Sequence, residues 1–265
     1  MNHVLASQQL ISPLILTGET VGYRTVALAV KINPSDVGKY MPDPPVIQVP
    51  ETCKMKVMTR VTICLEDQNI VYKLLQNQSL KRYDLLAVQP ANDKILNQVC
   101  GGSLECDILT FNYADRLPVD LKRANLTLPR SRGVCFEINY TDAFTSQSGR
   151  MNTISSAQLV MEKTKGKNVL ISSGARTDIS LRGPYDVANM GLLFGMKEIQ
   201  GRESVFTTGS LCIKHSDSRR NSNSMAVTVA LDRDAKDSIL RKKLMAAASF
   251  TPRSGEPERK KSKVK

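Results

Sequence analysis

The sequence predicts a parallel α/β fold on the basis of three observations. Short, continuous apolar runs rich in β-branched residues recur along the 265-residue chain, as expected for strands buried on both faces of a sheet. Amphipathic helical segments fall between several of these runs. Hydrophobic residues make up 41% of the chain, enough for a sizeable core. The alternation of strand and helix fits either a (β/α) barrel or an open doubly wound sheet, and periodicity does not decide between the two.

Six segments have the composition of buried strands. They are residues 25–30, 57–65, 83–88, 108–111, 134–138 and 168–172. Each is a continuous apolar run with little alternation of polar and apolar side chains, so neither face of these strands is expected to be open to water. A Pro-rich loop, residues 42–50, lies between the first two strands.

Helix start and stop signals lie between the predicted strands. A capping Asp or Asn, or a Pro at the first helical position, marks a start, and Gly marks a stop. Four helices are expected on these grounds: from the cap Asp67 to Leu75, from Asn92 or Asp93 to Gly101, from about Thr153 to Lys165, and from Pro184 to about Gly195.

Beyond His215 the chain becomes polar. Residues 216–224 are expected to form a loop, residues 225–231 one more strand, and residues 239–250 a short basic helix. From Thr251 onward the chain consists largely of Pro, Ser, Lys and Arg, which cannot bury enough surface to become ordered.

The formal net charge of +12 is concentrated in the tail. Residues 241–265 contain nine Lys or Arg against two Glu, which leaves the first 240 residues mildly basic. This balance suits either a polyanionic partner such as RNA or a soluble protein with a solvated basic tail. Aromatic residues make up 5% of the chain and Trp is absent, which argues against a surface that stacks single-stranded bases.

The six cysteines form no CxxC pair and lie mostly in apolar runs. They are expected to be small core residues in a reducing compartment, rather than a disulfide framework or a zinc site. No apolar stretch reaches the roughly 18–20 residues of a membrane span, and the N-terminus lacks the basic region of a signal peptide. We therefore expect no membrane association.

Metal-dependent chemistry lacks its ligands in this sequence. The two histidines are His3 and His215, and neither an HxH nor an HExxH motif occurs. A metal-dependent barrel phosphoesterase needs several His and carboxylate ligands at its strand ends. P-loop, GxSxG and GxGxxG motifs are also absent. We expect no catalytic residue, no metal and no cofactor.

Two ionisable residues have more than one interpretation. Glu137 lies inside an apolar strand, and it is either a functional carboxylate in a barrel interior or a structural one that is satisfied by hydrogen bonds or an Arg. His215 is followed by Asp217, Arg219 and Arg220. A lone His beside arginines is more often an RNA or structural contact than a catalyst.

Basic residues near the ends of the predicted strands are candidates for phosphate contact. Arg60 interrupts the second strand, Lys165 and Lys167 precede the sixth, and Arg176 and Arg182 follow the sixth. Residues after the strands of a parallel α/β domain converge on one rim, where Arg176 and Arg182 could hold phosphates. Salt bridges to helix ends or to neighbouring acids are the alternative.

Two adjoining blocks carry a resemblance to a known family. They are residues 166–175 (GKNVLISSGA) and 181–196 (LRGPYDVANMGLLFGM), supported by residues 22–28, 59–63, 83–88 and 132–140. Over roughly residues 18–220 the sequence resembles the thirty-kilodalton protein subunit of ribonuclease P and the related ribonuclease MRP.

The resemblance implies a TIM-barrel-like fold, related to the metal-dependent phosphoesterase (PHP) barrels but without their metal ligands. It implies a nuclear and nucleolar particle whose RNA subunit cleaves the 5′ leader of precursor tRNA. The protein would brace that RNA, meet precursor tRNA only indirectly, and pair with other protein subunits, including a small α/β partner. A stand-alone PHP-like phosphoesterase is the alternative, and a protein scaffold without RNA contact is a third possibility.

The resemblance also bears on the candidate site. Arg60, Lys167, Arg182, His215 and Arg219 match family positions that are suited to RNA or partner contact. Together with Arg176 and Arg220 they form a set of seven candidates.

The N-terminus departs from the family pattern, in which a short strand with an Asp-Leu pair is followed by a helix. We divide the chain into a divergent segment, residues 1–17, a barrel-like domain, residues 18–232, and a basic, largely disordered tail, residues 233–265. The parallel barrel is expected to be incomplete, because residues 25–30 lack one neighbouring strand. Residues 10–16 are a poor replacement, since Pro13 removes a backbone donor.

Overall fold

The core of the protein is a parallel sheet with the strand order β1-β2-β3-β4-β5-β6. The computed structural model describes residues 8–36, 42–47, 49, 53–75, 77 and 79–221. The strands are β1 (Thr25–Ile32), β2 (Lys56–Leu65), β3 (Leu85–Pro90), β4 (Ile108–Leu109), β5 (Cys135–Asn139) and β6 (Val169–Ser172). All six segments predicted as strands are confirmed, although β4 is only two residues long.

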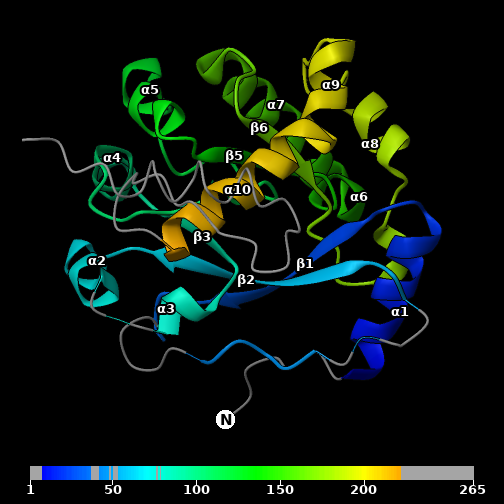
Figure 1. Cartoon of the computed structure of the whole chain (residues 1–265). Coiled ribbons are helices and arrows are strands. Elements are labelled where there is room, and N and C mark those ends of the chain that lie inside the picture. Colours follow the sequence, from blue (N-terminus) through cyan, green and yellow to red (C-terminus); the bar gives the residue numbers. More distant parts are fainter. Residues whose placement is uncertain are drawn as a thin grey trace, which may run out of the picture. The chain divides into compact units, whose positions relative to one another are not determined.

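The strand order decides between the two architectures that periodicity left open. In a doubly wound sheet the order reverses at one point, whereas here each strand pairs in parallel with the next strand of the sequence. The sheet curls into an open half barrel (Figure 1). A complete TIM barrel has eight strands, so the prediction of an incomplete TIM-barrel-like fold is confirmed.

Helices accompany the strands along the outer side of the half barrel, and one helix crosses its inner side (Figure 1). The helices of the described residues are α1 (Gln8–Thr20), α2 (Gln68–Leu75), α3 (Ser79–Arg82), α4 (Asp93–Gly101), α5 (Arg123–Ser131), α6 (Asp142–Thr145), α7 (Gln147–Thr164), α8 (Pro184–Met190), α9 (Glu198–Val205) and α10 (Thr207–Asn221), with a 3₁₀ turn, η1 (Asp178–Ser180). In these residues we find no helix that is both long and apolar enough to span a membrane.

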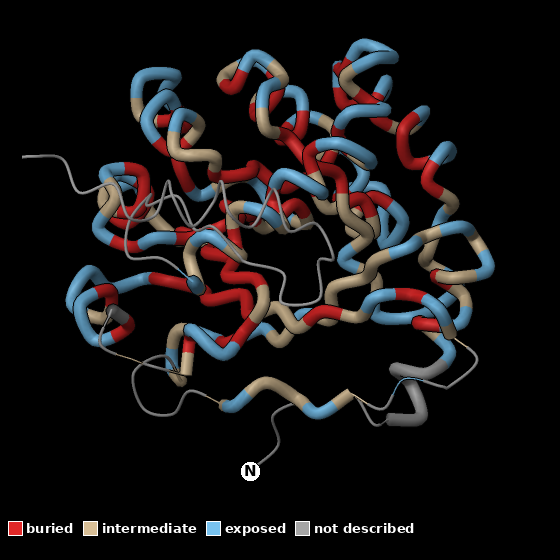
Figure 2. Tube along the Cα trace, viewed as in Figure 1, coloured by how far each residue is buried: buried red, intermediate tan, exposed pale blue. Residues whose placement is uncertain are grey.

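The two faces of the sheet pack against different helices. Outward-facing strand residues join buried residues of α4 and α7 in the main core. Inward-facing Met58, Ala87, Ile108 and Cys135 form a second, smaller cluster with Cys212 of α10. Figure 2 shows how the buried residues concentrate along the strands. Because α10 covers the inner face, β3 to β6 and the second half of β2 are buried on both sides, as their continuous apolar runs predicted. The prediction is wrong for β1, in which only Ile32 is buried.

The helix caps predicted from the sequence are present. Asn92 Oδ1 accepts a hydrogen bond at 2.9 Å from an amide of the first turn of α4, and Gly102, with φ of 96°, ends that helix. Asp67 Oδ1 accepts from the Asn69 amide at 3.0 Å at the start of α2. Pro184 is the first residue of α8. These local interactions fix where the helices begin.

Three helices differ from the sequence-based expectation. The helix α8 ends at Met190 and not near Gly195, and residues 191–195 form turns. The helix α7 starts at Gln147 rather than near Thr153, with the Ser146 hydroxyl accepting from the Gly149 amide at 2.9 Å. Its first turn is polar, so the apolar pattern becomes visible only later. The expectation of a loop over residues 216–224 is wrong for residues 216–221, which belong to α10. Its buried side chains are Thr208, Cys212 and Ser216, which are too small and polar to give an apolar stripe.

The N-terminal part of the described chain is helical. Residues 10–16, considered above as a replacement strand, lie within α1, which contains Pro13. The sheet order leaves β1 paired only with β2, so among the described residues one edge of β1 has no strand beside it. This confirms the expected missing neighbour. The predicted strand 225–231, the predicted helix 239–250 and the tail lie outside the described residues.

The described residues all belong to one compact unit, Met1–Ala226. Within it, Cys64, Cys100, Cys106, Cys135 and Cys212 are buried, and all six cysteines are free thiols. The prediction that the cysteines are mainly small core residues is confirmed. They leave the candidate site to other side chains.

Candidate functional site

The interior of the half barrel holds a buried ion pair between Arg60 of β2 and Glu137 of β5. The two guanidinium nitrogens of Arg60 donate to the two carboxylate oxygens of Glu137, with 2.6 Å between Nη2 and Oε2. The side chain of Glu137 is fully buried and that of Arg60 is 11% exposed. The strands β3 and β4 lie between β2 and β5 in the sheet, so the curl of the sheet brings the two side chains together.

Arg60 controls the protonation of this carboxylate. Burial by itself raises the pKa of Glu137, but the charge and hydrogen bonds of the Arg60 guanidinium outweigh it, and the pKa lies below the ordinary value of 4.5. Glu137 is therefore ionised and bound on both oxygens. The carboxylate lies in the barrel interior, and Arg60 satisfies it, as the structural interpretation predicted.

A second buried carboxylate, Asp107, anchors α10 to the sheet. Asp107 directly precedes β4 and is fully buried. Its Oδ1 lies 2.8 Å from Nδ1 of His215, and its Oδ2 lies 2.9 Å from Nη2 of Arg219. The Leu86 amide also donates to Oδ2 at 2.8 Å. With the Arg219 side chain only 7% exposed, this network holds the helix against the amino ends of the strands.

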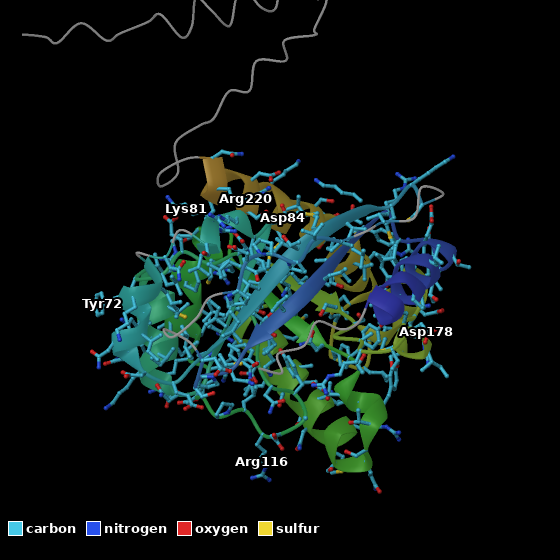
Figure 3. The ribbon with its side chains drawn as sticks, turned by 90° about the horizontal axis from the view of Figure 1, so that it is seen from below. Tyr72, Lys81, Asp84, Arg116, Asp178 and Arg220 are labelled. Carbon is cyan, nitrogen blue, oxygen red and sulfur yellow. The ribbon has the colours of Figure 1, made fainter. Side chains whose placement is uncertain are left out.

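Asp84, which precedes β3, forms the next anchor. Arg220 Nη1 lies 2.7 Å from Asp84 Oδ1, and Arg220 Nη2 lies 2.6 Å from Oδ1 of Asp217. The other carboxylate oxygen of Asp84 accepts from the amide and the hydroxyl of Thr59 in β2. Figure 3 shows Arg220 and Asp84 side by side at one end of the molecule. These contacts join α10 to β2 and β3.

The remaining three candidates, Lys167, Arg176 and Arg182, are exposed. The ion pairs among the described residues involve none of them. Arg182 lies over the ring of Phe144, with 5.3 Å from its guanidinium carbon to the ring centroid, and its Nη1 donates to two nearby backbone carbonyls. Such a contact orients a guanidinium and leaves much of it available.

The seven candidates therefore do not form one site. Arg60 lies inside the barrel, and His215, Arg219 and Arg220 lie together at the amino ends of the strands. Arg176 and Arg182 follow β6 and so lie beyond its carboxyl end, as predicted, whereas Lys167 precedes β6. Asp84 and Asp107 are not among the candidates predicted from the sequence. A signal was present, since each is an acid directly before an apolar strand.

The chain is similar to ribonuclease P proteins of several organisms. The family model for RNase P subunit p30 matches residues 3–221, and so begins within the segment set apart above as divergent. Ribonuclease P protein subunit p30 of Mus musculus is 32% identical over 227 residues, which cover 82% of this chain and 84% of that protein. Probable ribonuclease P protein subunit 3 of Schizosaccharomyces pombe is 31% identical over 209 residues, covering 78% and 86%.

A solved structure has the same fold. A chain in the cryo-EM structure of archaeal ribonuclease P with mature tRNA superposes with a TM-score of 0.61, at 14% sequence identity, and the match covers 86% of this chain and 96% of that chain. The family model matches residues 3–221, and the two relatives are more than 30% identical over most of both chains. The chain belongs to the RNase P subunit p30 family.

Proposed function

We propose that the protein is a non-catalytic subunit of ribonuclease P, in which the RNA component removes the 5′ leader of precursor tRNA. The family and its named relatives support a place in this particle and not a stand-alone phosphoesterase. The arrangement of the barrel interior supports a role without catalysis.

The ion pair between Arg60 and Glu137 carries this proposal. A general base works best with a pKa near the working pH, and a metal ligand must present an oxygen to the metal. Both oxygens of Glu137 are bound to Arg60, and its pKa is lowered. The described residues also contain no group of three or more His, Cys, Asp or Glu placed to hold a metal ion.

Two assays test the absence of catalysis. The purified full-length protein is expected to show no hydrolysis of a generic phosphodiester with Mn²⁺, Zn²⁺ or Mg²⁺. In reconstituted ribonuclease P, Glu137→Gln is expected to leave the rate of precursor-tRNA cleavage per assembled particle unchanged. Metal-stimulated turnover by the protein alone, lost in Glu137→Gln, would overturn the proposal.

For the contacts, we propose that Arg176, Arg182 and Lys167 meet RNA phosphates or a partner, while Arg60, His215, Arg219 and Arg220 hold the fold. Each lost phosphate contact lowers the salt dependence of RNA binding by about one unit of slope. Arg182→Ala is expected to lower this slope and to weaken affinity regardless of RNA sequence. If Arg182→Ala lowers only thermal stability, the arginine is structural.

The partners we propose are ribonuclease P RNA, the related ribonuclease MRP RNA, and other protein subunits, including a small α/β subunit. Precursor tRNA would be reached only through the particle. Purifying the full-length protein from cells under native conditions and sequencing the bound RNA tests this set. Recovery of ribonuclease P RNA alone would remove ribonuclease MRP from it.

We propose the nucleus, and within it the nucleolus, as the working compartment. The support is the set of ribonuclease P relatives and the basic stretch Lys260-Lys261-Ser262-Lys263, which has the composition of an import signal. A fluorescent fusion that ends at Phe250 is expected to lose nuclear accumulation. Unchanged nuclear accumulation would mean that this stretch is not the signal.

A further inference from the structure

The turns that lead from a helix into the next strand all lie at one end of a parallel sheet, the amino end. Basic residues lie in or just before three of these turns. Lys81 precedes β3, Arg130 and Arg132 precede β5, and Lys165 and Lys167 precede β6. Figure 3 shows Lys81 close to Asp84 and Arg220, while Arg116, from the loop after β4, lies at the opposite end of the molecule.

The acids at this end are mostly neutralised by α10. Asp107 is paired with Arg219, and Asp84 is paired with Arg220. Glu105, in the turn before β4, and Glu162, near the end of α7, are exposed acids, and Glu162 pairs with Lys163 at 3.1 Å. The cations of the turns before β5 and β6 therefore outnumber the free acids, and the amino end presents a positive surface to solvent.

The turn before β6 is the part of this surface that hydrogen bonds hold in place. Arg130 Nη1 donates to the carbonyl of Thr164 at 3.2 Å, which joins the turn before β5 to the end of α7. The Asn168 side chain donates to the carbonyl of Arg130 at 3.0 Å. Lys165 and Lys167, both exposed, lie within this bonded turn. We call Arg130, Lys165 and Lys167 the amino-end cluster.

The backbone of this turn singles out Lys165. Lys165, Gly166 and Asn168 have φ of 57°, 65° and 55°, a left-handed region that favours Gly and Asn. The Asn168 side chain is used in hydrogen bonds, and a Cβ on Gly166 would lie 2.3 Å from the Gln200 amide nitrogen. Lys165 is different, because its exposed side chain makes no hydrogen bond or ion pair with the described residues.

Lys165 is the C-cap of α7 in a left-handed conformation that favours glycine, and the helix dipole favours a cation at this end. Its exposed ammonium group makes no hydrogen bond or ion pair with the described residues, which leaves it free to bind outside the folded chain. An ammonium group on a bonded turn, with Lys167 two residues away and Arg130 beside it, suits successive phosphates of a nucleic-acid backbone. We propose that the amino-end cluster binds the phosphate backbone of the RNA component, with Lys165 as its principal contact. This inference rests on the proposed function and places an RNA contact at the end of the barrel opposite Arg176 and Arg182.

Two substitutions of Lys165 test the proposal on the full-length protein and in vitro transcribed ribonuclease P RNA. Lys165→Met removes the charge and keeps the strained backbone, so RNA affinity is expected to fall roughly five- to tenfold near 0.1 M salt, with a salt slope lower by about one. Lys165→Gly is expected to weaken RNA binding to the same extent and to raise the melting temperature by about 2–4 °C. The matched control is Arg116→Met, which removes an exposed cation at the opposite end. This variant is expected to change neither the RNA affinity nor the melting temperature.

Rising stability together with falling RNA affinity is a combination that a structural role of Lys165 does not produce. Unchanged RNA affinity in both variants would overturn the proposal. The proposal would also be overturned if the variants bind RNA normally but no longer assemble with the protein subunits. The cluster would then contact protein. If the unsubstituted protein neither binds this RNA nor supports cleavage in the reconstituted particle, the proposed function itself fails.

Discussion

Nδ1 of His215 lies 2.8 Å from Oδ1 of Asp107, and this contact joins the last described helix to the first residue before β4. Arg219, one turn further along α10, binds the same carboxylate. The three side chains hold α10 against the inner face of the half barrel at the amino ends of the strands. His215 and Arg219, candidates for RNA or partner contact from the sequence, thus bind a buried carboxylate of the same chain.

Asp107→Asn is expected to destabilise the protein by about 3–5 kcal/mol, because Arg219 would keep a buried charge without its partner. Chemical denaturation of the full-length protein measures this change. Asp43→Asn is the control: Asp43 pairs with Arg82 at the surface, where both side chains are more than 60% exposed, and its loss is expected to cost less than about 1 kcal/mol. Equal effects of the two substitutions would contradict the assignment of Asp107 as the anchor of α10.

Arg60→Met and Glu137→Gln are each expected to cost about 3–5 kcal/mol, because each leaves one buried partner unpaired. The double variant is expected to be less destabilised than the sum of the two, which a double-mutant cycle measures. Additive effects would show that the two side chains are not coupled. RNA affinity and its salt slope are expected to stay unchanged in any variant that remains folded, since the pair lies inside the barrel.

Glu137 also predicts a dependence of stability on pH. Because Arg60 lowers the pKa of Glu137 below 4.5 in the folded state, the unfolded state takes up this proton more readily. The stabilisation is therefore complete above about pH 4.5 and is lost as the pH falls through the folded-state pKa. Denaturation midpoints measured from pH 6 down to pH 3 are expected to fall more steeply for the unsubstituted protein than for Glu137→Gln. Parallel curves would rule out this role of the carboxyl group.

Among the described residues, one edge of β1 has no strand beside it, and this edge is expected to limit the stability of the protein. The sheet order gives β1 a strand neighbour on one side within the described residues, and an unpaired edge leaves backbone amides and carbonyls open to aggregation. A form of the chain that begins with the family's usual first strand is expected to have a higher midpoint of chemical denaturation and to be more soluble. If the two forms have equal midpoints and equal solubility, this edge is not a weakness.

The elements of the fold could be predicted because their signals are local. Continuous apolar runs identify the strands, and side chains such as Asn92, Asp67 and Pro184 mark helix starts through contacts within a few residues. The helix α10 could not be predicted, because its position depends on contacts that are not local. Its buried face consists of Thr208, Cys212 and Ser216, whose burial follows from packing against the sheet and not from an apolar pattern of their own.

For the candidate site, too, some properties follow from the sequence and others only from the tertiary structure. By itself, the sequence determined which residues carry charge, that histidine ligands are scarce, that a parallel α/β fold forms, and, through two blocks of resemblance, which family to expect. Only the tertiary structure decided which of those charges are free. Arg60 meets Glu137 across 77 positions and Arg219 meets Asp107 across 112, and contacts between residues so far apart depend on how the sheet curls and where α10 lies, which no local pattern encodes.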